Sequence, residues 1–96
     1  MELDWTPLAL DDRIEAFQHI ALESVRSAVK VDDAIESFVD QLIDFPEMGR
    51  AGRCAGTREL VITGYPFTAV YHIYGNTVRI LRVLHHAQNW PRHISF

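Results

Sequence analysis

Two adjacent histidines near the end of the chain are the side chains best suited to proton-transfer chemistry. His85 and His86 close an apolar run that contains one arginine, Arg82. An imidazole titrates near neutral pH and can accept or donate a proton, whereas a guanidinium can hold a phosphate or a carboxylate through two parallel hydrogen bonds. We therefore take His86, His85 and Arg82 as candidate catalytic residues.

Positive charge is concentrated in the second half of the chain. Residues 1–48 hold twelve acidic and three basic residues, a balance of −9, whereas residues 49–96 hold six arginines and one acid, a balance of +5. Such a chain can present one positive face although its net charge is −4. Alternatively, acidic helices solvate one side while arginines line the rim of a sheet. The candidate binding residues of this half are Arg50, Arg53, Arg58, Arg79 and Trp90.

Neither a metal site nor a nucleotide site is expected. Cys54 is the only cysteine, which excludes a disulfide framework and a cysteine-based zinc site. The spacing His-Glu-x-x-His is absent, and no Gly-Lys-Ser/Thr follows the glycines of residues 49–56. We expect no metal and no cofactor, and we interpret Cys54 as a small loop residue.

Length and composition predict one domain that spans residues 1–96. The N-terminus lacks a basic start and an apolar stretch typical of a signal peptide. No apolar run approaches the ~20 residues that cross a bilayer. We therefore expect a soluble cytoplasmic protein without a membrane segment.

The first half of the chain predicts a short strand and two amphipathic helices. Residues 2–5 alternate polar and apolar side chains, and Thr6-Pro7 is typical of a helix start. Residues 23–30 either continue this helix or form a turn, and Asp32 is the expected N-cap of the next helix, which Pro46 ends. The stripes predicted to face the core are Leu10, Ile14, Phe17 and Ala21 on the first helix, and Ile35, Phe38, Val39, Leu42 and Ile43 on the second.

The second half predicts a glycine-rich loop, residues 46–57, and three antiparallel strands over residues 58–63, 67–74 and 77–85. Gly75-Asn76 forms the two-residue turn of the last hairpin. The element order is therefore strand, antiparallel helical hairpin and three-stranded antiparallel sheet. Helices on one face of a small sheet are typical of the α+β class.

The two-residue turn also predicts the register of the last hairpin. Counting from the turn places Ala69 opposite Arg82 and Phe67 opposite Leu84 on an apolar face. His86 then shares the face of Arg82, and His85 shares the opposite face with His72 and Arg79. An arginine on an apolar face must emerge at the sheet end or find a buried partner, because an unpaired buried charge is very costly.

Five segments, in order along the chain, resemble the toxins of the RelE/ParE superfamily. The closing segment, residues 80–86 with Trp90-Pro91, is the most specific of them. The matches cover nearly the whole chain and agree with the predicted element order. The other four segments are Trp5-Thr6-Pro7, Phe45-Pro46-Glu47-Met48-Gly49-Arg50, Gly56-Thr57-Arg58-Glu59-Leu60 and Val70-Tyr71-His72-Ile73.

The resemblance implies the toxin of a bacterial type II toxin–antitoxin system, which a cognate antitoxin neutralises. RelE-like toxins cleave mRNA in the ribosomal A site without a metal, whereas ParE-like toxins inhibit DNA gyrase by protein contact. The fold does not decide between these mechanisms. By a small margin we take ribosome-dependent mRNA cleavage as the first hypothesis. The alternatives are a ParE-like gyrase inhibitor and a degenerate, non-toxic binding module.

The resemblance also suggests roles for the candidate residues. Histidine-dependent relatives carry a histidine near the end of the last strand, and His86 matches this place better than His85. Arg50, Arg53 and Arg58 would hold RNA phosphates in a nuclease, or antitoxin carboxylates in any toxin. Trp90 would stack on a base or cap the core. Two departures weaken the nuclease hypothesis: Thr68 stands where RelE-like nucleases usually carry an arginine, and the chain is acidic overall.

Overall fold

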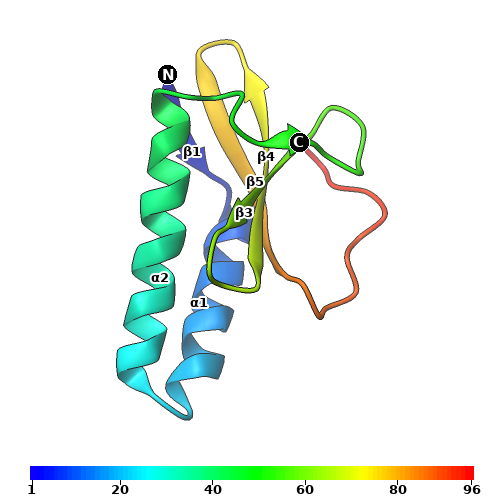
Figure 1. Cartoon of the computed structure of the whole chain (residues 1–96). Helices are drawn as coiled ribbons and strands as arrows, with labels where there is room; N and C mark the ends of the chain where they lie inside the picture. The colour runs from blue at the N-terminus through cyan, green and yellow to red at the C-terminus, as the bar shows by residue number, and fades with distance from the viewer.

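A five-stranded sheet separates the two helices from the C-terminal end of the chain (Figure 1). The structure, a computed structural model, describes all residues from Met1 to Phe96. The predicted α+β class and element order are confirmed. The elements are β1 (Glu2–Trp5), α1 (Pro7–Ala21), α2 (Val25–Asp40), the 3-10 helix η1 (Gln41–Ile43), β2 (Arg50–Ala51), β3 (Arg58–Ile62), β4 (Phe67–Tyr74) and β5 (Thr77–His85).

The strand order in the sheet is β1-β5-β4-β3-β2. β1 pairs with β5 in parallel, and the other neighbours are antiparallel. The sequence predicted a loop where β2 lies, because two residues between glycines carry no periodic signal. β1 ends at Trp5, opposite Ile80, so the second half of β5 has no strand on that side.

Local capping explains where the two helices begin. The Thr6 hydroxyl accepts a hydrogen bond from Ala9 N at 3.2 Å, with Pro7 in the first turn, as predicted. The chain turns at residues 22–24, and Ser24 caps α2. The prediction of Asp32 as an N-cap was wrong, because Asp32 lies inside α2 and forms a two-point ion pair with Arg13 of α1 at 2.9 and 3.0 Å.

The stripe predicted to face the core on α1 lies mostly outward, because Leu10 and Ile14 are exposed and Phe17 and Ala21 are half-buried. Leu10 and Ile14 are 43% and 53% exposed, whereas Ala9 is buried and Ile20 packs against the core. Small side chains on the inner face let a helix lie close to a sheet, so periodicity alone selected the wrong face. The prediction holds for Ile35 and Val39 of α2 and for Leu42 of η1, which are buried. Phe38 is partly buried against the core, while Ile43 of η1 is exposed.

The register of the last hairpin follows the prediction as far as Tyr71 opposite Ile80 and then changes. A bulge leaves Leu81 without a partner, so that Val70 faces Arg82, Ala69 faces Val83 and Phe67 faces His85. The predicted pairs Ala69–Arg82 and Phe67–Leu84 were therefore wrong. One extra residue moves Val83, Leu84 and His85 to the other face of the sheet, whereas Arg82 lies at the open edge of β5 beside α1. His85 lies on the helix side and His86 on the opposite side, the reverse of the prediction.

The main core lies between the helices and one face of the sheet. Thirteen buried residues form it, drawn from α1, α2, η1 and strands β3 to β5. Tyr71 anchors it, since its hydroxyl donates to Pro46 O at 2.7 Å and accepts from Gly49 N at 2.9 Å. These bonds fix the loop after η1 to the sheet and hold β2 at its edge.

Candidate functional site

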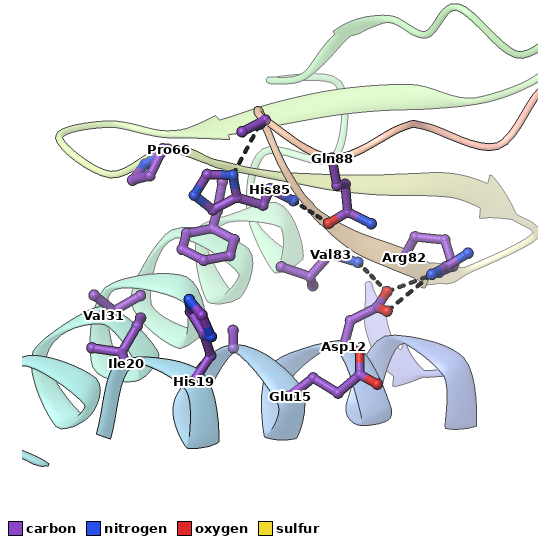
Figure 2. A pocket seen from close by; sticks show the side chains of 13 residues that line it. Asp12, Glu15, His19, Ile20, Val31, Pro66, Arg82, Val83, His85 and Gln88 are labelled. Atoms are coloured by element: carbon purple, nitrogen blue, oxygen red, sulfur yellow. Dashed lines mark hydrogen bonds and ion pairs between the residues drawn. The ribbon is translucent and has the colours of Figure 1, made fainter. Parts of the chain in front are cut away.

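The bulge in β5 divides the candidate residues between two hollows on opposite faces of the sheet. The first is a groove of about 750 Å³ between α1 and the ends of β4 and β5 (Figure 2). Its floor is apolar, and acidic and histidine side chains stand along it. Its lining includes Asp12, Glu15, His19, Ile20, Val31, Phe67, Arg82, Val83 and His85.

Arg82 is held at the edge of this groove by Asp12 of α1. The carboxylate accepts from Arg82 Nε at 2.8 Å and Nη2 at 3.0 Å, and from Val83 N at 2.9 Å. Asp12 thus caps the stretch of β5 that β1 leaves unpaired. Hydrogen bonding to Asp12 raises the pKa of Arg82, against the opposing effect of burial. The arginine therefore has a largely buried partner, one of the two outcomes predicted for it, and its guanidinium is engaged in a structural contact.

His85 lines the same groove. Its ring stands edge-on to Phe67, with centroids 5.0 Å apart and planes at 88°. Nδ1 accepts from Ala87 N at 2.9 Å, and His85 N donates to the Gln88 side chain at 2.7 Å. Figure 2 shows His19 of α1 across the groove from this ring. These contacts fix the imidazole as part of the turn after β5.

The second hollow, of about 410 Å³, lies on the other face and brings together four of the predicted residues. His86 Nε2 is 2.8 Å from the Thr68 hydroxyl. The Arg53 guanidinium lies 3.7 Å from the Trp90 ring centroid, and the Trp90 indole donates to His85 O at 3.0 Å. Arg50 completes the group. This hollow therefore contains an imidazole, two guanidinium groups and an indole, and Arg82 and His85 lie outside it.

Glu59 holds the two arginines of the second hollow. Its carboxylate is only 3% exposed and accepts from Arg53 N at 2.8 Å, Arg53 Nε at 3.2 Å and Arg50 Nη2 at 3.2 Å. Burial acts to raise the pKa of Glu59, but the hydrogen bonds from Arg53 and Arg50 outweigh it and the pKa is lowered. Glu59 was not among the predicted site residues, although it is the single acid among residues 49–96. That isolation was a usable signal, because a lone acid among arginines is well placed to pair with them.

Two further predicted residues lie outside both hollows. Arg58 donates to Gly49 O at 2.8 Å and to Glu47 O at 3.3 Å, so it ties β3 to the preceding loop. Arg79 pairs with Asp4 of β1 at 3.1 Å and lies over the Tyr74 ring. Both guanidinium groups bind neighbouring parts of the same chain.

The structure contains no cluster of three or more His, Cys, Asp or Glu side chains that could hold a metal ion. Neither helix has the length and apolar character required to cross a membrane.

Comparisons with known proteins agree with this architecture. The family model of the ParE toxin of type II toxin–antitoxin systems (parDE) matches residues 3–90. The chain is 38% identical over 88 residues to a candidate toxin of Sinorhizobium fredii, Y4kP, covering 92% of this chain and 91% of that protein. It also superposes on a structure of the chromosomal ParDE system of P. aeruginosa with a TM-score of 0.80 and 28% identity, covering 88% of this chain and 95% of the other.

The fold is that of the RelE/ParE superfamily of small toxins. Within it, the chain belongs to the ParE toxin family of type II toxin–antitoxin systems.

Proposed function

We propose that this toxin acts in the cytoplasm as a ParE-like inhibitor of DNA gyrase through protein contact, and that a cognate antitoxin neutralises it. The observation that carries the proposal is the separation of the candidate catalytic residues. His86 lies on one face of the sheet, while His85 and Arg82 line a groove on the other.

Metal-free RNA cleavage needs a base, an acid and a phosphate-binding cation around one reacting group. Here Arg82 is engaged by Asp12, and His86 shares a hydrogen bond with Thr68. Arg50 and Arg53 are partly neutralised by Glu59. Family membership in the ParE group and this arrangement both favour inhibition without bond cleavage.

An assay with the purified toxin distinguishes gyrase inhibition from mRNA cleavage. We expect it to inhibit DNA supercoiling by gyrase in vitro, and its expression to cause DNA-damage signalling and filamentous cells with mRNA intact. His86→Ala should retain this inhibition, with Ser95→Ala as an exposed control. Normal supercoiling together with codon-biased mRNA cuts on ribosomes would contradict the proposal. Unaffected growth would point to a non-toxic binding module.

Ribosome-dependent mRNA cleavage is the second candidate, and the second hollow favours it. His86, Arg50, Arg53 and Trp90 line this one space, where a ribose and its phosphate could contact an imidazole and two guanidinium groups. In that case His86→Ala should abolish cleavage in a ribosome assay while the melting temperature stays close to that of the wild type. His85→Ala, on the other face, is the matched comparison and should leave cleavage largely intact.

The groove of the first hollow supports the proposed antitoxin contact. Ile20, Val31 and Phe67 give it an apolar lining, and Glu15 is exposed beside it. An amphipathic segment can bury its apolar side chains in such a groove. We expect Glu15→Lys to change the affinity for the antitoxin encoded beside the toxin by about tenfold, and Asp33→Lys on α2 to have little effect. Equal affinities of both variants and the wild type in calorimetry would argue against this groove.

A further inference from the structure

The centre of the sheet face turned away from the helices is buried although no helix covers it. Thr68, Val70 and Leu84 share this face and are at most 1% exposed. They lie outside the core cluster between the sheet and the helices. On this side Figure 1 shows the end of the chain and the loop between β2 and β3. The C-terminal segment, Trp90–Phe96, is therefore part of the cover.

Side chains make the contacts that hold this C-terminal segment. Trp90 stacks on Arg53, and the Phe96 ring lies 4.5 Å from the His72 ring. Phe96 also passes close to Gly56, where an added Cβ would lie 3.2 Å from the ring. The segment contains no strand or helix, and none of the backbone hydrogen bonds outside the regular elements involves it. Because the segment is not hydrogen-bonded to a strand through its backbone, it can leave the sheet face while the hydrogen bonds between the strands stay intact.

The fit of Phe96 over His72 is chemically incomplete. Nε2 of His72 is buried and has no hydrogen-bond partner. A buried polar group without a partner is destabilising, and a phenyl ring offers no conventional acceptor. A ligand that combined an aromatic ring with a polar atom able to hydrogen-bond Nε2 would bind His72 more completely.

We propose that this sheet face is a peptide-binding surface and that the C-terminal segment is its displaceable occupant. On this surface one aromatic ring can stack on the Arg53 guanidinium, and a second can lie against the His72 ring and Gly56. The partner that fits is a peptide segment with aromatic side chains and a polar atom that hydrogen-bonds His72 Nε2, and it competes with Trp90–Phe96. Binding of such a peptide to this surface does not depend on which target the toxin acts on.

The test uses the full-length variant W90A/F96A, in which the two aromatic occupants are removed. The probe is a synthetic peptide with the sequence of residues 90–96, titrated into the isotope-labelled variant. We expect saturable chemical-shift changes at Gly56 and His72, and binding at least about tenfold tighter than to the wild type, whose surface is occupied. Thermal unfolding monitored by circular dichroism checks that the variant is folded.

A peptide with alanine in place of both aromatic residues is the matched control, and it should bind at least about tenfold more weakly. If the double variant does not fold, Phe96→Ala alone serves, since Phe96 is 55% exposed and its removal disturbs the fold least. Shift changes elsewhere, no saturation, or equal binding by the wild type or by the alanine peptide would each overturn the proposal.

Discussion

At the scale of single residues, Glu59 determines the geometry of the second hollow. Its carboxylate receives the backbone and side chain of Arg53 and the side chain of Arg50, and so fixes the loop between β2 and β3. Arg53 in turn supports Trp90. One buried acid therefore positions three of the residues that the sequence marked for binding.

We expect Glu59→Gln to lower the free energy of unfolding by about 1–3 kcal/mol, because it weakens these charged hydrogen bonds. Urea denaturation measures this change, and Glu47→Gln, an exposed acid nearby, is the control. The lowered pKa of Glu59 means that its contribution is present above pH 4.5 and lost as the pH falls below it. If the free energy of unfolding of Glu59→Gln falls as steeply below pH 4.5 as that of the wild type, Glu59 is not the source of this pH dependence.

We expect His72 to give the stability of the fold a second dependence on pH. Burial, with the charge of Arg79, lowers the pKa of His72 below 6.5, so the unfolded chain binds its proton more readily than the folded chain. The contribution of His72 to stability is thus full above pH 6.5 and decreases as the pH falls below that value. His72→Phe should reduce the fall in melting temperature between pH 7 and pH 5, whereas His93→Phe on the exposed C-terminal segment should not. If the melting temperatures of the wild type, His72→Phe and His93→Phe fall equally between pH 7 and pH 5, His72 does not cause this pH dependence.

At the scale of elements, Asp12 joins α1 to β5. It serves as the partner of Arg82 and as the acceptor for Val83 N, where β1 has ended and β5 has an open edge. β1 pairs with the backbone of the first half of β5, and the Asp12 carboxylate of α1 then accepts the hydrogen bond of Val83 N beyond the end of β1. The same contact engages Arg82 and separates it from the second hollow.

We expect Asp12→Ala to destabilise the toxin by about 2–3 kcal/mol, because Arg82 and Val83 N both lose their acceptor. Asp11→Ala, one residue earlier and exposed, should change the stability by less than about 0.5 kcal/mol. Chemical denaturation of the two variants gives the comparison. Equal stability would mean that Asp12 is dispensable for the docking of α1.

At the scale of the whole molecule, one core connects all the regular elements except β2. Helix residues such as Val39 and Leu42 share it with sheet residues such as Tyr71 and Ile80. We therefore expect the helices and the sheet to unfold together in one two-state transition. Circular dichroism at 222 nm and the fluorescence of Trp5 and Trp90 should give the same midpoint in urea. Two distinct midpoints would show separate folding units.

The sequence by itself determined the family, the element order, the helix start at Thr6 and the strands β4 and β5. These depend on local signals: a capping threonine, a two-residue turn and alternating apolar residues. Only the tertiary structure decided which face of α1 is buried and which face of the sheet each histidine occupies. A bulge is one residue without a local signature, yet it reverses His85 and His86. The partners of Arg82 and Arg53 likewise depend on acids 70 and six residues away, Asp12 and Glu59, which the fold brings together.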